Sequence, residues 1–231
     1  MSVNSSAAGH LPRSVDPGRP FDGYRVLHEG MLRSAAAGVS VGVVLDDAVS
    51  YGVAEPESAP YLQRVRADGV ATVRRSSGGT GIVHAPGDLV WAVVLPRTDP
   101  RVGRDFVRAY DRFGRGLVSF LVERGRASRW VPAPGLTPAY CPLSGRGQVL
   151  EVNGQVLAAA AQHVTARALL HHGTLPRTLD RARIARWFDL TSPGPADRLT
   201  SLKEQGVDEP PAEVARAVAE HLADGLDRPE A

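Results

Sequence analysis

The chain has few of the residues on which whole classes of protein depend. Cys141 is the only cysteine among 231 residues, so an internal disulfide and a thiolate metal cage are both excluded. No apolar run approaches the ~20 residues of a membrane span. The N-terminus has no charged segment followed by an apolar one, as a signal peptide would. We therefore expect a cytoplasmic protein with no membrane association. Lys203 is the only lysine.

The composition is otherwise that of an ordinary globular protein. Hydrophobic residues make up 43% and charged residues 23% of the chain, and the length suits one domain with a good core. The formal net charge is only +2, and the pI of about 9.0 reflects the use of arginine. Because no run of basic residues interleaves with aromatics, nucleic acid is not expected as a partner.

The order of apolar patterns predicts an α+β fold, a mixed or antiparallel β-sheet flanked by helices. Residues 1–22 are polar and rich in Gly, Pro and Ser, so we expect a flexible leader there, followed by a single domain over 23–231. The predicted elements are a helix over 24–35 capped by Gly38, a strand over 39–45, a helix over 61–67, a buried strand over 89–95, a helix from Pro100 carrying Phe106 to Leu121, a hairpin of 149–152 and 155–161 turning at Asn153-Gly154, strand material over 164–175, a short helix over 184–188 that ends by Pro193, and a closing helix from Pro211. The stretch from Trp130 to Pro142 is expected to be irregular.

Residues 73–84 contain several residues of the kinds that bind ligands. Arg74 and Arg75 stand at the entrance of a loop of small residues, and Ile82 to His84 follow as a second apolar segment. Small residues let a backbone pass close to a ligand, and arginine forks suit a phosphate or carboxylate. The pattern is neither a P-loop nor the G-x-G-x-x-G fingerprint. It predicts an anion-facing loop between two strands; the alternative is a glycine-rich hairpin with solvated arginines.

The same stretch resembles the signature of the lipoate–protein ligase family. The residues that carry the resemblance are Arg74-Arg75-x-Ser77-Gly78-Gly79, then Ile82-Val83-His84, then Gly87-Asp88-Leu89. That family shares its catalytic fold with biotin–protein ligases and octanoyltransferases. The departures from the pattern are Thr80 in place of the third glycine, Val83 in place of an aromatic residue, and Ala85 in place of aspartate.

The resemblance resumes in the second half of the chain. Glu151 to Gln162 is similar to the family's xVNGKKIAGSAQ segment, His172 to Leu175 to its HGT segment, and Arg198 to Leu202 to its R-x-TSL segment. The similarity spans roughly residues 24–207 in the expected order. It therefore implies the fold of the biotin/lipoate protein ligase catalytic domain.

The implied activity is the attachment of lipoate or octanoate to a lysine of a lipoyl domain through an acyl-adenylate, with ATP and Mg as cofactors. In the family, the second residue after Asn-Gly is a lysine that contacts the acid and the adenylate; here that position is Val156. An ammonium offsets the charge that develops at the carboxylate and phosphate. An arginine such as Arg146 or Arg167 could reach the site, although its planar fork is not equivalent. The activity is thus expected to be weak or altered. The alternative is a non-catalytic protein that binds an acyl group or a nucleotide.

A second alternative is an octanoyltransferase that works through a thioester on Cys141. The other interpretation of Cys141 is an inert buried thiol. His163, His171 and His172 have no carboxylate at ligand spacing, so they are expected to be sheet histidines and no metal site is predicted.

The predicted ligand site joins the arginine-glycine loop to the small-residue strand of the hairpin. The loop over residues 74–81 should line the mouth of the main pocket and lie against Ala158 to Ala161, unless that run is simply a tightly packed central strand. The expected partners are a small acyl ligand and either a lipoyl domain or an acyl carrier protein. The residues expected to contact the ligand are Arg74, Arg75, Ser77, Gly78, Gly79, Thr80, Gly81, His84, Asp88, Val156, Ala158, Ala159 and Ala160.

Overall fold

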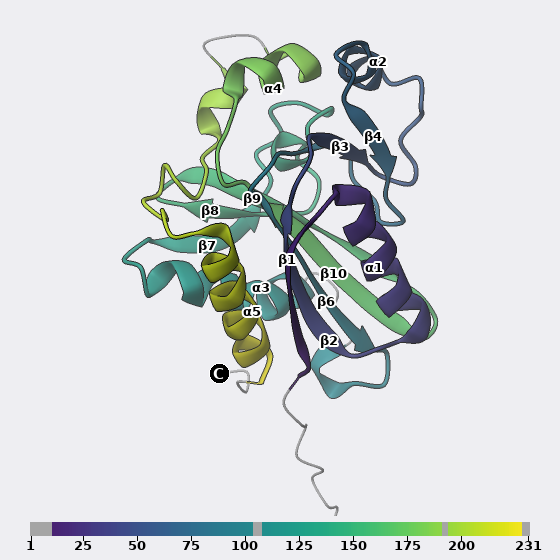
Figure 1. The fold of residues 1–231 in the computed structure, drawn as a ribbon, viewed down its shortest axis with the longest axis vertical. Coiled ribbons are helices and arrows are strands. Elements are labelled where there is room, and N and C mark those ends of the chain that lie inside the picture. Colours follow the sequence, from purple (N-terminus) through teal and green to yellow (C-terminus); the bar gives the residue numbers. More distant parts are fainter. Residues whose placement is uncertain (1–10, 104–107, 191–193, 228–231) are drawn as a thin grey trace, which may run out of the picture.

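A computed structural model of the chain describes residues 11–103, 108–190 and 194–227, and two β-sheets form its frame (Figure 1). The larger sheet has seven strands in the order β1-β2-β6-β10-β9-β8-β7. Only β1 and β2 run parallel, and the other neighbours are antiparallel. The strands are β1 (Arg13–Arg19), β2 (Gly38–Val44), β6 (Leu89–Pro96), β7 (Ser128–Pro132), β8 (Gln148–Val152), β9 (Gln155–Val164) and β10 (Ala168–Leu175).

The smaller sheet has three strands in the order β4-β3-β5, and it presents the central stretch of the sequence. Its strands are β3 (Ala48–Tyr51), β4 (Ala71–Arg74) and β5 (Ile82–His84). Strand β3 pairs parallel with β4 and antiparallel with β5. The connection from β4 to β5 is the segment 75–81, which we call the glycine loop.

Helices cover both faces of the large sheet. α3 (Arg108–Val122) and α5 (Pro211–Asp227) pack together on one face, over the main core, while α1 (Phe21–Ser34) crosses the other face (Figure 1). α2 (Pro60–Ala67) and α4 (Arg181–Phe188) lie beside the small sheet around a second apolar cluster. Three short 3₁₀ turns are η1 (Pro100–Val102), η2 (Cys141–Leu143) and η3 (Pro195–Arg198). The predicted α+β fold is therefore confirmed.

The predicted hairpin forms as its turn chemistry requires. Strands β8 and β9 pair across Asn153 and Gly154, whose φ angles are 49° and 81°. Positive φ at both positions is the condition for a type I′ turn, which asparagine and glycine meet at low cost. The Asn153 side chain also donates to Gln205 Oε1 at 2.8 Å, which ties the turn to the segment before α5.

The predicted leader is wrong for the part of it that the structure describes. Strand β1 forms the edge of the large sheet beside β2, Leu11 is buried in the main core, and α1 already begins at Phe21. The pairing partner of β1 lies about 26 residues further along the chain (Arg13 pairs with Val39), so no local pattern reveals it. Residues 1–10 lie outside the described part.

Several element boundaries also differ from the prediction. Helix α1 ends at Ser34 and is capped by Ala35, which takes the left-handed conformation with φ of 52°, while the expected cap, Gly38, belongs to β2. Strand β7 occupies part of the stretch expected to be irregular, and β3 was not expected at all. Helix α4 ends at Asp189, also left-handed. Phe106 and Pro193 fall outside the described residues.

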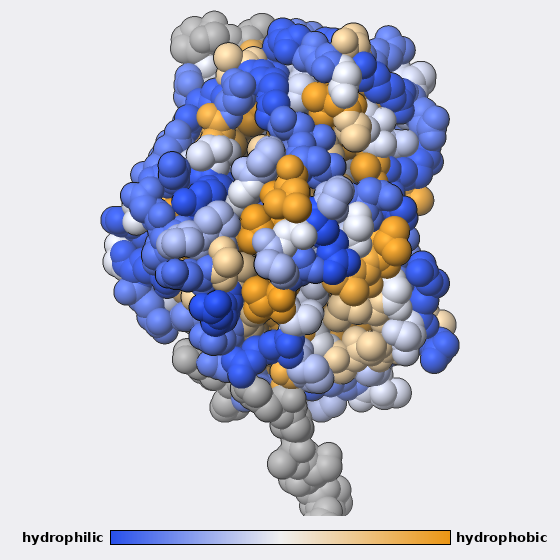
Figure 2. Space-filling view, viewed as in Figure 1, coloured by the Kyte–Doolittle hydropathy of each residue, from blue (hydrophilic) through white to orange (hydrophobic). Residues whose placement is uncertain are grey.

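The surface has mixed polarity. On the face shown in Figure 2, hydrophobic residues appear in patches among hydrophilic ones. Among the helices of the described segments, none is both long and apolar enough to cross a lipid bilayer.

Candidate functional site

The glycine loop needs glycine where its backbone passes against another strand end. Gly79 has a φ of 93°, a conformation that residues with a Cβ rarely adopt. A Cβ on Gly52, just after β3, would lie 2.0 Å from the carbonyl oxygen of Gly79, so this second position also excludes a side chain. Thr80 is not among the residues with positive φ. The threonine is therefore compatible with the loop at the position of the family's third glycine.

The two arginines of the central stretch go to different places. Arg74 is exposed, with its guanidinium over the Tyr51 ring and 3.1 Å from Glu57. Arg75 is 4% exposed and lies inside the loop, where Nη2 donates to the carbonyls of Gly78 and Thr80. Arg75 therefore shapes the loop from within, whereas Arg74 lines none of the pockets described below.

A chain of hydrogen bonds runs from Arg75 into the large sheet. Arg75 Nη1 donates to Ser50 Oγ at 2.8 Å, and Ser50 Oγ lies 2.7 Å from His84 Nε2. His84 Nδ1 lies 3.1 Å from Thr174 Oγ1 on β10, and Phe21 stacks on the His84 ring at 3.6 Å. Since Ser50 accepts from the guanidinium, its hydroxyl can donate to Nε2, which leaves Nδ1 protonated to donate to Thr174. Burial, with the charge of Arg75, holds the pKa of His84 well below its usual value.

Two further histidines meet on the α1 side of the large sheet. His172 Nε2 lies 2.7 Å from Ser77 Oγ, which anchors the glycine loop to β10. His28 of α1 faces the His172 ring edge-on at 6.4 Å, and its Nε2 has no hydrogen-bond partner. Burial lowers the pKa of His28 to about 3, so both rings are neutral near pH 7. His28 is one helical turn from Tyr24 and Leu32, so that spacing could have placed it on the buried face of α1.

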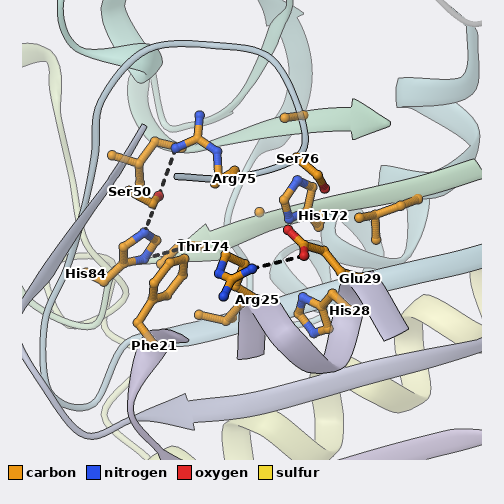
Figure 3. A pocket seen from close by; sticks show the side chains of 15 residues that line it. Phe21, Arg25, His28, Glu29, Ser50, Arg75, Ser76, His84, His172 and Thr174 are labelled. Carbon is orange, nitrogen blue, oxygen red and sulfur yellow. Dashed lines mark hydrogen bonds and ion pairs between the residues drawn. The ribbon is translucent and has the colours of Figure 1, made fainter. Parts of the chain in front are cut away.

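These groups line a pocket between α1, the glycine loop and the large sheet, which we call the α1 pocket (Figure 3). Arg75 and Ser76 of the loop and Ala161 of β9 line this pocket together, while the expected contact of the whole loop with Ala158 to Ala161 stays a prediction. Apolar side chains supply much of the lining. No sequence pattern pointed to Phe21 and Ser50, because α1 and β3 reach this pocket only through the fold. The apolar lining residues are Phe21, Ile82, Val90, Ala161 and Leu170.

Cys141 is held directly against the glycine loop. Gly81 N donates to Ala139 O at 3.1 Å, and Cys141 N donates to Gly81 O at 2.9 Å. A Cβ on Gly79 would meet Cys141 Sγ at 3.0 Å and Arg75 Nη2 at 3.1 Å. The thiol is 5% exposed. The structure thus brings the sequence-predicted cysteine, the loop and a guanidinium to one point.

A second pocket adjoins the first, with Ile82 and Thr174 in both walls; we call it the α4 pocket. Ala158 and Ala159 line it, and so does Asp88, which accepts from Ala85 N at 2.9 Å and Arg177 N at 2.7 Å. Burial raises the pKa of Asp88 to about 7, against these two backbone donors, which lower it.

Several of the expected contact residues line neither pocket: besides Arg74, these are residues 77–81 of the glycine loop, Val156 and Ala160. Ala160 lines neither pocket and packs in the main core on the α3 side, because side chains alternate along β9. Val156 is buried in the apolar cluster near α2 and α4, and its carbonyl accepts from Thr200 N at 2.9 Å. Their proposed contact with a ligand stays a prediction.

The remaining histidines give no metal site. His171 is fully buried on the opposite face of β10, among Trp91, Tyr110 and Phe113, and neither ring nitrogen has a partner. Within residues 11–103, 108–190 and 194–227, no group of three His, Cys, Asp or Glu side chains could hold a metal ion.

The fold and the α1 pocket together define a class of protein. It is an α+β domain in which a glycine loop, a buried arginine and a thiol lie close to an apolar pocket. The family described as "Lipoyl protein ligase A/B catalytic domain" matches residues 25–223. The chain belongs to that family.

Curated relatives fall into ligases and acyltransferases. The chain is 23% identical over 215 residues to "Octanoyltransferase LipM" of Exiguobacterium sp., covering 77% of this chain and 76% of the relative. It is 30% identical over 158 residues to "Octanoyl-[GcvH]:protein N-octanoyltransferase" of Kyrpidia tusciae, covering 68% and 51%. It is 29% identical over 147 residues to "Probable lipoate-protein ligase A" of Mycoplasma genitalium, covering 64% of this chain and 36% of that protein. The chain thus spans about a third of the mycoplasma protein.

Solved structures support the fold. A structure of "lipoate-protein ligase A bound with ATP" has a TM-score of 0.73 at 20% identity, covering 94% of this chain and 85% of that one. A putative lipoate protein ligase from T. acidophilum with bound lipoic acid has a TM-score of 0.69 at 19% identity, covering 94% and 86%. Family and fold therefore agree with lipoyl or octanoyl transfer in general.

Proposed function

We propose that this protein transfers an octanoyl-type or lipoyl-type acyl group to a lysine of an acceptor protein through a thioester on Cys141. The observation that carries the proposal is the placement of this thiol. Two backbone hydrogen bonds fix residues 139–141 to Gly81, and Sγ then lies against Gly79 of the glycine loop. A cysteine nucleophile divides a difficult acyl transfer into two easier steps.

The α1 pocket is the proposed place for the acyl chain. Its apolar walls suit a hydrocarbon chain, while Arg75 at the loop offers a donor to the carbonyl oxygen. His28 and His172 of the lining are neutral, and the two charged lining residues of α1, Arg25 and Glu29, pair with each other at 3.0 Å.

Donor and acceptor classes come from the relatives. Six curated relatives are octanoyltransferases: five have the name "Octanoyltransferase LipM", and the name of the sixth specifies an octanoyl-[GcvH] donor. A structural neighbour is a bipartite archaeal ligase described with its E2 lipoyl domain. We propose a carrier-bound acyl thioester as donor and a lipoyl domain as acceptor.

A second candidate is the ligase reaction through an acyl-adenylate, with ATP, Mg and free lipoate or octanoate. The shared glycine loop and the ATP-bound neighbour favour it. The charges of the α4 pocket do not fit a polyphosphate: Asp88 and Asp180 line it, and its one arginine, Arg183, is paired with Asp47 at 2.8 Å. With Val156 at the lysine position, we derive no step through ATP.

The test is intact-protein mass spectrometry after incubation with octanoyl-loaded carrier protein. Wild type should gain one octanoyl group that hydroxylamine removes, and Cys141→Ser should gain none that hydroxylamine removes. Adding a lipoyl domain should discharge the adduct and leave an amide on the domain. Wild type that remains unmodified after prolonged incubation would sink the thioester route. Acid binding without any transfer would leave the non-catalytic binding protein as the function.

A further inference from the structure

The acyl-transfer centre has lost the ammonium that the family places there, and no lysine replaces it. Val156 is buried among apolar side chains. Lys203, the only lysine, is exposed, and its backbone N–H donates to Arg177 O at 3.1 Å. If the proposed function holds, another group must offset the negative charge that forms on sulfur and oxygen during transfer.

Arg75 is a buried cation that forms no close ion pair with a carboxylate, although the charge of Glu55 acts on it from a longer distance. Of the arginines and lysine in the described segments, only Arg75 is classed as buried, and no carboxylate there lies within ion-pair distance of it. Its Nη atoms donate to Ser50 Oγ and to the Gly78 and Thr80 carbonyls, while Nε has no partner. Burying a charge in this way is costly unless an anion lies close to it. The site can therefore accept an anion in direct contact with Arg75, a contact that no carboxylate of the described segments makes.

That anion has a place beside Arg75. A Cβ placed on Gly79 would lie 3.1 Å from Arg75 Nη2 and 3.0 Å from Cys141 Sγ. The guanidinium and the thiol therefore both lie next to this glycine. Arg75 also lines the α1 pocket proposed for the acyl chain (Figure 3). Two buried hydroxyls nearby, Tyr61 Oη and Thr80 Oγ1, have no partners either.

We infer that Arg75 supplies, in this chain, the positive charge that the family's lysine supplies elsewhere, and that it acts on both anions of a thioester transfer at Cys141. This inference rests on the proposed function. The Cys141 thiolate attacks the carbonyl carbon of the donor thioester, and Arg75 stabilises first the thiolate and then the oxyanion of the tetrahedral intermediate. Collapse breaks the bond to the donor sulfur, which leaves as a thiolate and takes a proton from water. In the second half, the lysine amine attacks, loses a proton to solvent and expels Cys141 as thiolate. Arg75 keeps its proton throughout.

The first test compares the rate of octanoyl-adduct formation in wild type, Arg75→Gln and Arg75→Lys, with octanoyl-coenzyme A as the probe. Losing one preorganised donor should slow acylation by about 10²–10³-fold in Arg75→Gln. Arg75→Lys should lose less, since it keeps the charge. Arg66→Gln, an exposed arginine on α2, is the matched control and should stay within about twofold of wild type, as surface charges contribute little.

Arg75 also holds the loop through the Gly78 and Thr80 carbonyls, so a loss in Arg75→Gln could be purely structural. The double variant Arg75→Gln/Val156→Lys separates these roles, because it returns an ammonium at the family position but none of the loop bonds. We expect the double variant to be acylated at least about tenfold faster than Arg75→Gln, which is a part of the effect that one donor typically has. A loss that neither the double variant nor Arg75→Lys recovers assigns Arg75 a structural role and overturns the inference.

A second measurement does not require acyl transfer. Cys141 is the only cysteine, so alkylation by iodoacetamide reports this thiol alone. A neighbouring guanidinium stabilises the reactive thiolate, so Arg75→Gln should slow alkylation roughly tenfold at fixed pH. An unchanged alkylation rate overturns the inference even if wild type forms the adduct. Absence of an adduct with a slowed alkylation rate would reject the proposed function alone.

Discussion

At the residue scale, Val156 stands where the sequence resemblance predicts a lysine, and its surroundings are those of a core residue. It is 2% exposed, beside Leu199 and the second apolar cluster. We expect the wild type to make little acyl-adenylate from ATP and lipoate.

Val156→Lys should raise that adenylation rate, because an ammonium would enter a groove that already has Arg75 and the glycine loop. One restored donor can change a rate by about 10²–10³-fold, and Thr80 and Ala85 will reduce the gain because catalytic groups act as a unit. Pyrophosphate release measures it, with Val156→Met as the uncharged control of similar length. Rapid adenylation by the wild type would contradict this account of Val156.

His171 is a buried base without a partner, and its burial lowers its pKa to about 3. The unfolded chain, with a pKa near 6.5, binds this proton first. Stability from neutral His171 is therefore complete above about pH 6.5 and is lost as the pH falls towards 3.

At pH 5 the loss should be about 2 kcal/mol, the difference of 1.5 pH units from the unfolded pKa. His171→Leu should remove it. The measurement is urea unfolding of both proteins at pH 7.5 and pH 5.0; the difference between the two pH values cancels the change in packing. Equal pH dependence of variant and wild type would show that His171 does not take up this proton on unfolding.

At the element scale, strand β1 shows how an edge strand joins a core. Leu11, just before it, is 2% exposed in the main cluster, whereas Val15 within it is 39% exposed. We expect Leu11→Ala to cost about 2–4 kcal/mol of unfolding free energy, the range for buried leucines.

Val15→Ala serves as the matched control in the same strand and should cost less than about 0.5 kcal/mol, as most exposed positions do. Thermal or urea unfolding measures both. Equal, small effects would return residues 11–19 to the loosely attached leader that their composition predicts.

The helices and strands that depend on local sequence signals could be predicted, and those that depend on distant pairing could not. The hairpin at Asn153-Gly154, strand β6 and the period of α5 were predictable, since turn chemistry and apolar period are read within a few residues. Strands β1, β3 and β7 were missed because each is short or pairs with a distant partner.

The candidate site divides in the same way. The loop residues could be predicted because they stand in one contiguous stretch, whereas Phe21, His28 and Ser50 reach the pocket from separate elements. The direction of the side chains along β9 was not predicted either. Because the side chains alternate, Ala161 lines the α1 pocket and Ala160 lies in the main core.

At the scale of the whole molecule, the site lies between two sheets that share no backbone ladder. Side chains join them: His84 to Thr174 at 3.1 Å and Ser77 to His172 at 2.7 Å, with the Asp88 carboxylate holding Arg177 N at 2.7 Å. The α1 pocket takes one wall from each sheet.

The boundary between the two sheets affects the rate at which the protein opens locally. Side-chain bonds between two sheets break at lower cost than the ladders within each, so local opening should part the small sheet from the large one before global unfolding. Amides of β3 and β5 should then exchange with deuterated solvent sooner than those of β6 and β10, in a hydrogen-exchange experiment read by mass spectrometry. A bound octanoyl chain touches both walls, so it should slow exchange in β3 and β5 while leaving β6 almost unchanged. Uniform exchange across both sheets would mean that they open together, and that ligand entry needs some other motion.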